Sequence, residues 1–222
     1  MVLMELYDVM RSTSAVREFA DDPLPDDVLA RILDNARFAP SGGNRQGVRV
    51  IVVRDEDTQS ALADLGLPAA RRYIAQQANG EAPWNPLRPS GVDASAIEAT
   101  EVPAQMASSV RRAPVVLVVC LDLGVVAATD QDLDRVGVVS GASVYPFVWN
   151  VLLAARSEGY GGVLTTMAVA EEPKVKSLLG VPDSYAIAAV VPLGKPAHLV
   201  TKLRRRQVSE FVTRERFDGP PF

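Results

Sequence analysis

Three runs of mostly β-branched residues constrain the fold of this chain most strongly. They are Val48–Val53, Val115–Leu121 and Ala186–Leu193, and each is almost continuously apolar. Such runs are typical of strands that are covered on both faces, because a solvated face would bring alternating polar residues. Segments with helical periodicity near residues 57–66 and 69–79 separate the first two runs. We therefore expect buried strands with helices between them.

The chain has room for one core of this kind. It has 222 residues, of which 48% are hydrophobic, and two full domains would be cramped in this length. We expect residues 1–222 to form a single domain. No apolar run reaches the roughly 18 residues that a membrane span needs, and residues 1–12 lack the apolar core and cleavage site of a signal peptide. The expected location is the cytoplasm, without a membrane partner.

Helices are expected where apolar residues recur every three to four positions. Residues 28–36 show this spacing after a proline-rich cap at residues 23–26. Residues 132–158 are apolar nearly all round, which predicts a central or interface helix, and Pro146 marks a kink or a new start within it. Shorter helices are expected at Met4–Met10, at residues 173–179 before Gly180, and at residues 208–212.

The stretch from Glu81 to Pro103 is long for a connection within a compact domain. It contains Trp84, with Pro83 before it and Asn85 after it. Two interpretations stay open for this stretch, which we call the lid segment. It is either a functional lid or mobile segment, or a plain surface excursion.

Histidine and cysteine chemistry is nearly absent. Cys120 is the one cysteine and lies in a predicted buried strand, which favours an inert core residue, and His198 is the one histidine. A His/Cys zinc site lacks ligands, and a Ser-His-Asp triad would depend on His198, for which we expect a surface role, so we expect neither a bound metal nor a catalytic side chain. A cofactor is then the natural source of reactivity. The formal charge of −4 also disfavours nucleic-acid binding.

Three separated segments carry residues suited to holding a phosphate: Arg11–Arg17, Pro40–Gln46 and Lys202–Arg206. Arginine supplies charge and donors in a planar fork that binds phosphate bidentately. The glycine pair at residues 42–43 is no Walker A loop, since no Gly-Lys-Ser/Thr follows, and no GxGxxG motif, since it follows a helix. Each segment taken alone also fits a solvated surface.

In their order along the chain these motifs resemble the nitroreductase family of FMN-dependent flavoproteins, from Met4 to about Phe217. The family's Arg-Ser-x-Arg-x-Phe-like segment is similar to residues 12–19, and its Ala-Pro-Ser-x-x-Asn-x-Gln loop appears as Ala39–Gln46. The second match is the more specific. Residues 178–182 and 190–196 are similar to the family's leucine-glycine-proline turn and to the exit from its last core strand. Separate surface roles do not explain this shared order.

The resemblance implies a flavin site. With Phe19 aligned, Arg17 occupies the basic position that in the family lies near the flavin pyrimidine edge, where a cation favours the anionic reduced flavin. One group of residues matches the loop against the isoalloxazine ring and a second group matches the segment along its other side. The first group is Pro40, Ser41, Gly42 and Asn44, and the second is Gly162, Val163, Leu164 and Thr165.

The phosphate half of that site departs from the family pattern. The alignment puts Thr13 where the family has its first arginine. Either Arg11 reaches the phosphate in a shifted register, or the hydroxyls of Thr13 and Ser14 share the task with other arginines; we prefer Arg11 together with the hydroxyls. The C-terminal phosphate arginine is Arg205 or, alternatively, Arg204. The residues implied to bind the phosphate are thus Arg11, Ser12, Thr13, Ser14, Arg204 and Arg205.

The resemblance also implies an α+β fold, with a mixed β-sheet flanked by helices, assembled as an intertwined homodimer with each FMN at the subunit interface. NADH or NADPH would reduce FMN by hydride transfer at N5, leave, and be replaced by an electron-poor acceptor such as a nitroaromatic or a quinone. Trp84 and Tyr73 are expected to line the acceptor pocket. Two alternatives remain: an enzyme for one dedicated substrate, acting by dehalogenation, flavin cleavage or ring oxidation, and a flavin-binding protein without catalysis.

Overall fold

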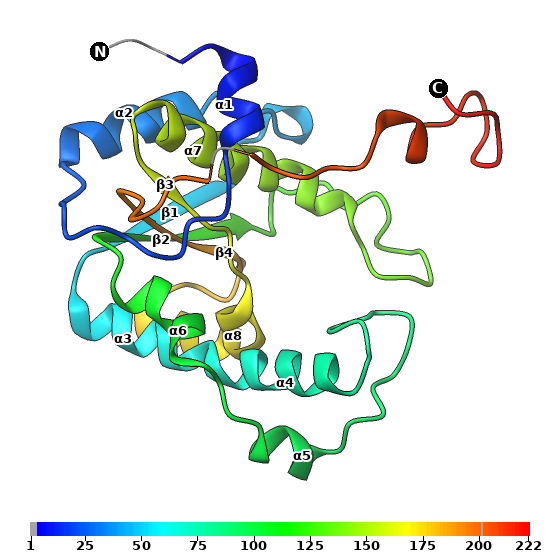
Figure 1. Cartoon of the computed structure of the whole chain (residues 1–222), viewed down its shortest axis with the longest axis horizontal. Helices are drawn as coiled ribbons and strands as arrows, with labels where there is room; N and C mark the ends of the chain where they lie inside the picture. Colours follow the sequence, from blue (N-terminus) through cyan, green and yellow to red (C-terminus); the bar gives the residue numbers. More distant parts are fainter. Residues whose placement is uncertain (1–3, 201) are drawn as a thin grey trace.

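The chain folds as one antiparallel sheet with helices packed on both of its faces (Figure 1). The structure is a computed structural model that describes residues 4–200 and 202–222. The helices, in chain order, are α1 (Leu6–Ser12), α2 (Asp26–Ala36), α3 (Glu56–Leu65), α4 (Leu67–Ala78), α5 (Ala94–Ala99), α6 (Ala104–Arg111), α7 (Tyr145–Ser157) and α8 (Glu172–Leu179). The strands are β1 (Val48–Val53), β2 (Val115–Asp122), β3 (Gly161–Gly162) and β4 (Tyr185–Gly194), and the 3₁₀ turns are η1 (Gly42–Asn44), η2 (Val139–Ser143), η3 (Met167–Glu171) and η4 (Val208–Glu210).

The strand order in the sheet is β1-β2-β4-β3, with every neighbouring pair antiparallel. A parallel bridge between Ala15 and Gly162 adds the N-terminal segment beside β3. The three strands expected from the β-branched runs are confirmed as β1, β2 and β4. The α+β fold expected from the resemblance is confirmed as well, but parallel pairing in the expected mixed sheet is limited to this one bridge among the described residues.

Strand β2 separates two hydrophobic cores because its side chains alternate between the faces of the sheet. Val115, Leu117 and Val119 join the core under α2 and α7. Val116 and Val118 join the core under α3, α6 and α8. All five residues are fully buried. The expected burial on both faces is therefore confirmed for β2.

Strand β1 corrects the expectation that all three strands are covered on both faces. Val52 is 44% exposed and Arg49 is exposed as well. The reason is position, because β1 is an edge strand that pairs with β2 on one side. A run of β-branched residues predicts the strand but does not distinguish an edge strand from a central one.

The helix expected over residues 132–158 is wrong in its first half. Helix α7 begins at Tyr145, with Pro146 in its first turn, so the alternative of a new start at Pro146 is the correct one. The preceding chain is instead organised around Asp130, whose carboxylate accepts hydrogen bonds from the backbone N–H of Val138 at 2.7 Å and of Val139 at 3.3 Å. A side chain that bonds backbone groups in this way competes with helix formation.

Helix α1 ends later than expected, at Ser12 rather than Met10. The hydroxyls of Ser12 and Thr13 donate back to the carbonyls of Asp8 and Val9, at 2.6 and 2.7 Å. Polar residues that were expected to end the helix therefore complete its last turn. The helices expected at residues 28–36 and 173–179 are confirmed as α2 and α8. Residues 208–212 form only the 3₁₀ turn η4.

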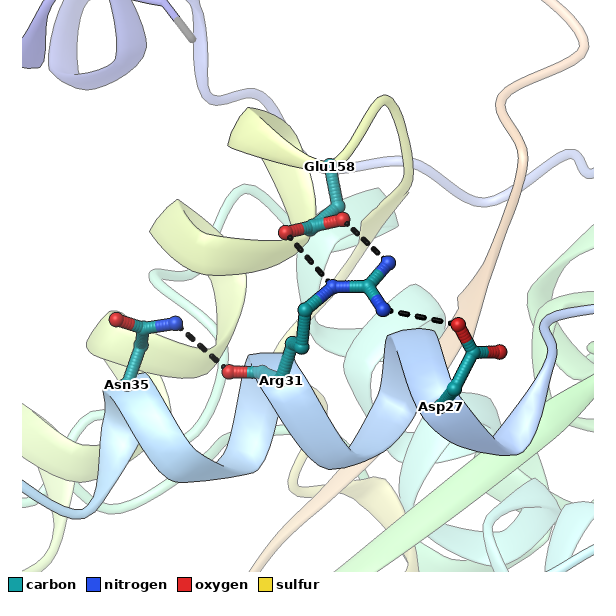
Figure 2. A network of polar contacts seen from close by, with 4 residues as sticks. All are labelled: Asp27, Arg31, Asn35 and Glu158. Atoms are coloured by element: carbon teal, nitrogen blue, oxygen red, sulfur yellow. Dashed lines mark hydrogen bonds and ion pairs between the residues drawn. The ribbon is translucent and has the colours of Figure 1, made fainter. Parts of the chain in front are cut away.

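An ion-pair network ties α2 to the end of α7 (Figure 2). Arg31 of α2 pairs with Asp27 at 2.9 Å and with Glu158, the residue after α7, at 3.1 Å. The hydrogen bond with Glu158, followed by that with Asp27, raises the pKa of the Arg31 guanidinium, and the Arg31 bond lowers the pKa of the Asp27 carboxyl. Because Glu158 directly precedes the turn into β3, the network helps to hold that turn against α2.

Within the described residues, no helix combines the length and the apolar character that crossing a membrane requires.

Replacing Ile32 by Ala tests the core beneath α2. Ile32 is fully buried, so the shorter side chain should lower the free energy of unfolding by about 2–5 kcal/mol through lost transfer energy and a residual cavity. Urea denaturation of the purified chain measures this change. Leu178→Ala is the matched control, because Leu178 lies on α8 with 40% of its surface exposed. Equal losses in the two variants would contradict the packing described here.

Candidate functional site

The N-terminal segment lies directly against β3, because glycines leave room for it. The backbone N–H of Val16 donates to the carbonyl of Gly162 at 2.9 Å. A Cβ atom on Gly161 would lie 2.7 Å from Cγ2 of Val16, closer than side-chain carbons normally approach. The pairing continues at the end of β4, where Ala20 donates to the carbonyl of Lys195 at 2.9 Å. This contact places Arg17 next to Gly162.

Arg17 opens onto a cavity of about 430 Å³ between the N-terminal segment and α6. Glu18, Gln105, Ser108 and Arg112 also line it. Within the described residues, the side chains of Arg17 and Arg112 form no ion pair or hydrogen bond, so neither arginine is paired with Glu18 or with another acidic side chain. The sequence reasoning missed Gln105, Ser108 and Arg112, because only the packing of α6 brings these residues to Arg17.

The segment from Gly162 to Thr165 runs along the same edge of the sheet. Thr165 forms a pair of backbone hydrogen bonds with Val190 of β4, both 2.9 Å long. Thr165 and Met106 of α6 line one small apolar cavity. Helix α6 therefore presents Met106 toward Thr165 and Gln105 toward the cavity of Arg17. The structure brings Arg17 together with the expected residues Gly162, Val163, Leu164 and Thr165 at this edge.

The expected loop Pro40–Asn44 belongs to a second group of residues, beside β1 and α7. Ser41 accepts a hydrogen bond at Oγ from the N–H of Gln46 at 2.9 Å, and Gly42 donates its N–H to Oγ of Ser143 at 3.1 Å. Asn44 adopts a left-handed backbone with φ 54°, a conformation that asparagine tolerates better than most residues. Pro40, Ser41, Ser143 and Phe147 line a cavity of about 180 Å³. The loop is thus held in one shape and faces an open cavity.

The two groups lie at opposite corners of the sheet. Gly162 of β3 pairs with Leu193, which faces Val115 at the start of β2. Val48, just after the loop, faces Leu121 near the end of β2. With about 3.3 Å per residue along a strand and about 4.8 Å between strands, these corners are separated by roughly 20 Å along the sheet and roughly 14 Å across it. One copy of the chain does not bring both groups to one small-molecule ring.

The contacts that the structure describes do not bring the expected phosphate-binding residues together at one place. Thr13 is buried, and its hydroxyl is already bonded to Val9. Ser12 accepts a hydrogen bond at Oγ from Nε of Arg156 at 3.1 Å. Arg11 is exposed, with its guanidinium 6.0 Å from the Tyr7 ring centre. Arg11 and Ser14 are therefore the members of this segment with the most freedom to meet a ligand.

The C-terminal arginines lie on an arm that leaves the body of the molecule (Figure 1). Arg204 and Arg205 are exposed, and Nη1 of Arg205 donates to the carbonyl of Arg204 at 2.8 Å. Further along the arm, Phe211 and Phe217 are exposed as well. Nothing in this arrangement directs the two arginines toward Arg17 of the same chain.

The lid segment projects from the C-terminal end of α4, away from the sheet (Figure 1). Glu81 closes its base by accepting hydrogen bonds from Ser90 Oγ at 2.7 Å and from the N–H of Gly91 at 2.8 Å. These bonds, with that of Ser90 the strongest, lower the pKa of the Glu81 carboxyl. The Trp84 ring stacks on Arg72 of α4, with 4.2 Å between the guanidinium carbon and the ring centre. Trp84 and Tyr73 line neither the cavity of Arg17 nor that of Pro40.

The remaining reactive groups have structural surroundings. Cys120 is buried in β2, and burial raises the pKa of its thiol, as expected of an inert core residue. Residues 4–200 and 202–222 contain no group of three or more His, Cys, Asp or Glu side chains placed to hold a metal ion. The two cavities are lined by arginine, amide, hydroxyl and carboxylate side chains, with no histidine or cysteine among their lining residues.

Comparisons with known proteins bear on the family and the fold of this chain. The model of the nitroreductase family matches residues 10–195. An NADH dehydrogenase of Thermus thermophilus is 29% identical over 82% of this chain and 82% of its own, and a nitrobenzene nitroreductase of Ectopseudomonas oleovorans is 25% identical over 93% and 95%. Among solved structures, an iodotyrosine deiodinase bound to FMN and 3-iodo-L-tyrosine superimposes with a TM-score of 0.68 over 96% of this chain and 99% of its own, at 22% identity.

Asp130 should make the stability of residues 130–143, which lead to Ser143 at the cavity of Pro40, depend on pH. Its buried carboxylate accepts hydrogen bonds from the N–H of Val138 and from Arg135, the latter at 2.8 Å. These bonds, with that of Val138 the strongest, lower the pKa of the Asp130 carboxyl. Because the pKa is lowered in the folded state, the ionised carboxylate stabilises the loop at pH values above about 4, the ordinary pKa of aspartate. This stabilisation is lost as the pH falls through the folded pKa. Hydrogen exchange of residues 130–143, corrected for intrinsic rates, should therefore accelerate below about pH 4. Asp130→Asn should exchange quickly at every pH, and the exposed Asp132→Asn should behave as the native chain; an unchanged profile in Asp130→Asn would contradict this role.

Proposed function

The chain belongs to the nitroreductase family, and on that premise we propose that it is an FMN-dependent oxidoreductase shared between two copies of the chain. NADH or NADPH is the electron donor, and a nitroaromatic or quinone is the acceptor. The observation that carries the proposal is the separation of the two groups of site residues at opposite corners of one sheet. A second copy is the simplest source of the missing half of each site.

The residues of the two groups fit a flavin. Arg17, Gln105 and Arg112 offer positive charge and amide donors to a polar ring edge, in a cavity without a neutralising ion pair. The backbone of Gly162–Thr165 offers a narrow, flat side next to that cavity, since β3 has no side chains. Pro40–Asn44 of the second copy would cover the other side of the ring. Arg11 and Ser14, with Arg204 or Arg205, would take the phosphate.

When bound, FMN would supply the chemistry, accepting a hydride equivalent at N5 from the nicotinamide and passing it to the acceptor in ping-pong order. The protein's own contribution is binding and charge. Arg17 places a cation where negative charge develops on the ring, which favours the reduced form. The fixed loop Pro40–Asn44 orients the ring, because Ser143 and Gln46 hold that loop through hydrogen bonds with its backbone and side chain. No side-chain nucleophile is required.

The outer face of α7 supports assembly as a homodimer. Val148, Val151 and Ala155 face the core, whereas Tyr145 and Trp149 remain 43% and 44% exposed on the same helix. Exposed aromatic side chains beside an apolar helix are typical of a surface that a protein partner covers. Another side of the same helix reaches the loop Pro40–Asn44 through Phe147, which lines the same cavity as Pro40.

A dedicated substrate is a second candidate, because the lid segment is closed at its base rather than loose. Glu81 and the Arg72–Trp84 stack hold the base of that segment. The segment lines neither cavity of its own chain, and an ordered segment of this kind would be suited to selecting one acceptor where it covers the site of the second copy. Steady-state comparison of nitroaromatic, quinone and halogenated aromatic acceptors separates the two functions. Similar rates with many acceptors support the general reductase, and uniformly slow NAD(P)H oxidation supports a dedicated substrate.

The purified chain should be yellow, or should become so on addition of FMN. NADH or NADPH should bleach the flavin band in stopped-flow spectroscopy, and a nitroaromatic or quinone should restore it in a second mixing step, as a ping-pong order requires. A colourless chain that does not take up FMN would contradict the proposed cofactor. Bound FMN that neither nicotinamide reduces would instead identify a flavin-binding protein without this activity.

Mixed dimers test whether each site takes one half from each copy. Arg17→Glu should damage the half beside β3, and Pro40→Trp should fill the cavity of the loop without removing a hydrogen bond; each variant alone should lose bound FMN. Co-expressed with different tags and purified for both, the mixed dimer should regain one intact site, measured as about half of the native FMN content by absorbance. The control is Arg17→Glu co-expressed with itself under both tags, which should remain colourless. A colourless mixed dimer would show that both halves come from the same copy.

A further inference from the structure

We propose that Arg112 is a second cationic group that acts together with Arg17 on the bound flavin and raises its reduction potential; this inference rests on the proposed function. Arg17 comes from the N-terminal segment and Arg112 from the residue after α6, yet both line the same cavity of about 430 Å³. Of these two arginines, the resemblance to the family assigns a role only to Arg17.

Among the residues that line this cavity, positive charges outnumber negative ones. Arg111, the neighbour of Arg112, pairs with Asp64 at 2.5 Å, and Arg54 pairs with Asp26 at 2.7 Å. Within the part of the chain that the structure describes, Arg17 and Arg112 have no such pair, and Glu18 is the one acidic residue lining the cavity. Two like charges facing one cavity repel each other, and an anion between them is stabilised by both.

The cavity is also joined to the segment expected along the flavin ring. Val16, next to Arg17, is hydrogen-bonded to Gly162. Helix α6 turns Gln105 and Ser108 toward the cavity and Met106 toward Thr165. Arg112 lies one turn beyond Ser108, whose carbonyl accepts its N–H at 2.9 Å. The two arginines thus flank a position beside the Gly162–Thr165 segment.

The expected effect follows from charge balance. Two-electron reduction of FMN with uptake of one proton leaves the ring with one additional negative charge; the electrons and the proton come from the nicotinamide. A cation near the ring stabilises that product more than the neutral oxidised ring. Arg112 therefore shifts the reduction equilibrium of the holoprotein toward the reduced form, in addition to the effect of Arg17.

The test is the midpoint potential of bound FMN, measured by equilibration with a reference dye, in a charge series at position 112. Arg112→Gln should lower the equilibrium constant for flavin reduction about tenfold, which lowers the midpoint potential of a two-electron couple by about 30 mV. Arg112→Glu should lower the potential further, and Arg112→Lys should stay close to the native value. Because the order follows charge, a purely structural role of Arg112 does not produce it.

Arg111→Gln is the matched control, since Arg111 lies one residue away at the same helix end but is paired with Asp64 outside this cavity. Its potential should equal that of the native holoprotein. A second measurement is the dissociation constant of sulfite, which adds a negative charge to the ring and should bind about tenfold more weakly to Arg112→Gln. Native potentials throughout the Arg112 series would overturn this inference and leave the FMN site intact. A native chain that binds no FMN would overturn the proposed function and this inference together.

Discussion

The burial of β2 on both faces is the constraint on which the rest of the structure depends. Its alternate side chains close two separate cores, one under α2 and α7 and one under α3, α6 and α8. Burial of apolar surface contributes about 25 cal/mol per Å², and a strand that is fully buried on both faces gains this on each side. With β2 fixed between β1 and β4, the positions of the sheet's edges and corners are fixed as well.

The edges then decide where a ligand can bind. At the β3 edge the sheet ends in glycines, and the N-terminal segment approaches them closely enough for Val16 to bond Gly162. Gly194 likewise lets Phe19 pack closely against the backbone, since a Cβ atom added to Gly194 would lie 2.7 Å from the Phe19 ring. Backbone contacts therefore place Arg17, and its cavity against α6 follows from helix packing. At the β1 edge, the hydrogen bond between Gly42 and Ser143 holds the loop in a comparable way.

Local chemistry accounts for the parts of the fold that the sequence predicts correctly. The β-branched runs identify β1, β2 and β4, and Gly180, with φ 65°, ends α8 where a left-handed residue is needed. The helix expected from residue 132 is wrong because the Asp130 carboxylate accepts hydrogen bonds from backbone N–H groups such as that of Val138. Apolar periodicity does not reveal this interaction. Arg112 and Gln105 were missed because their relation to Arg17 depends on contacts across about 90 residues of chain. Motif order predicted the residues of each group, but only the strand order shows that the groups lie apart.

The proposed division of the flavin site between two copies would have an energetic consequence. A ligand that binds the assembled dimer and not the separate chains stabilises the dimer by RT ln(1 + [L]/Kd), about 2.7 kcal/mol when the ligand is present at one hundred times its dissociation constant. On the proposed function, cofactor binding and assembly would be coupled, and each chain would contribute one fixed loop and one cationic cavity to sites shared with its partner. The exposed aromatic side chains Tyr145 and Trp149 lie on the helix beside that loop. On the proposed function, helix α7 would take part in both, through Tyr145 and Trp149 in the contact between copies and through Phe147 beside the loop in the flavin site.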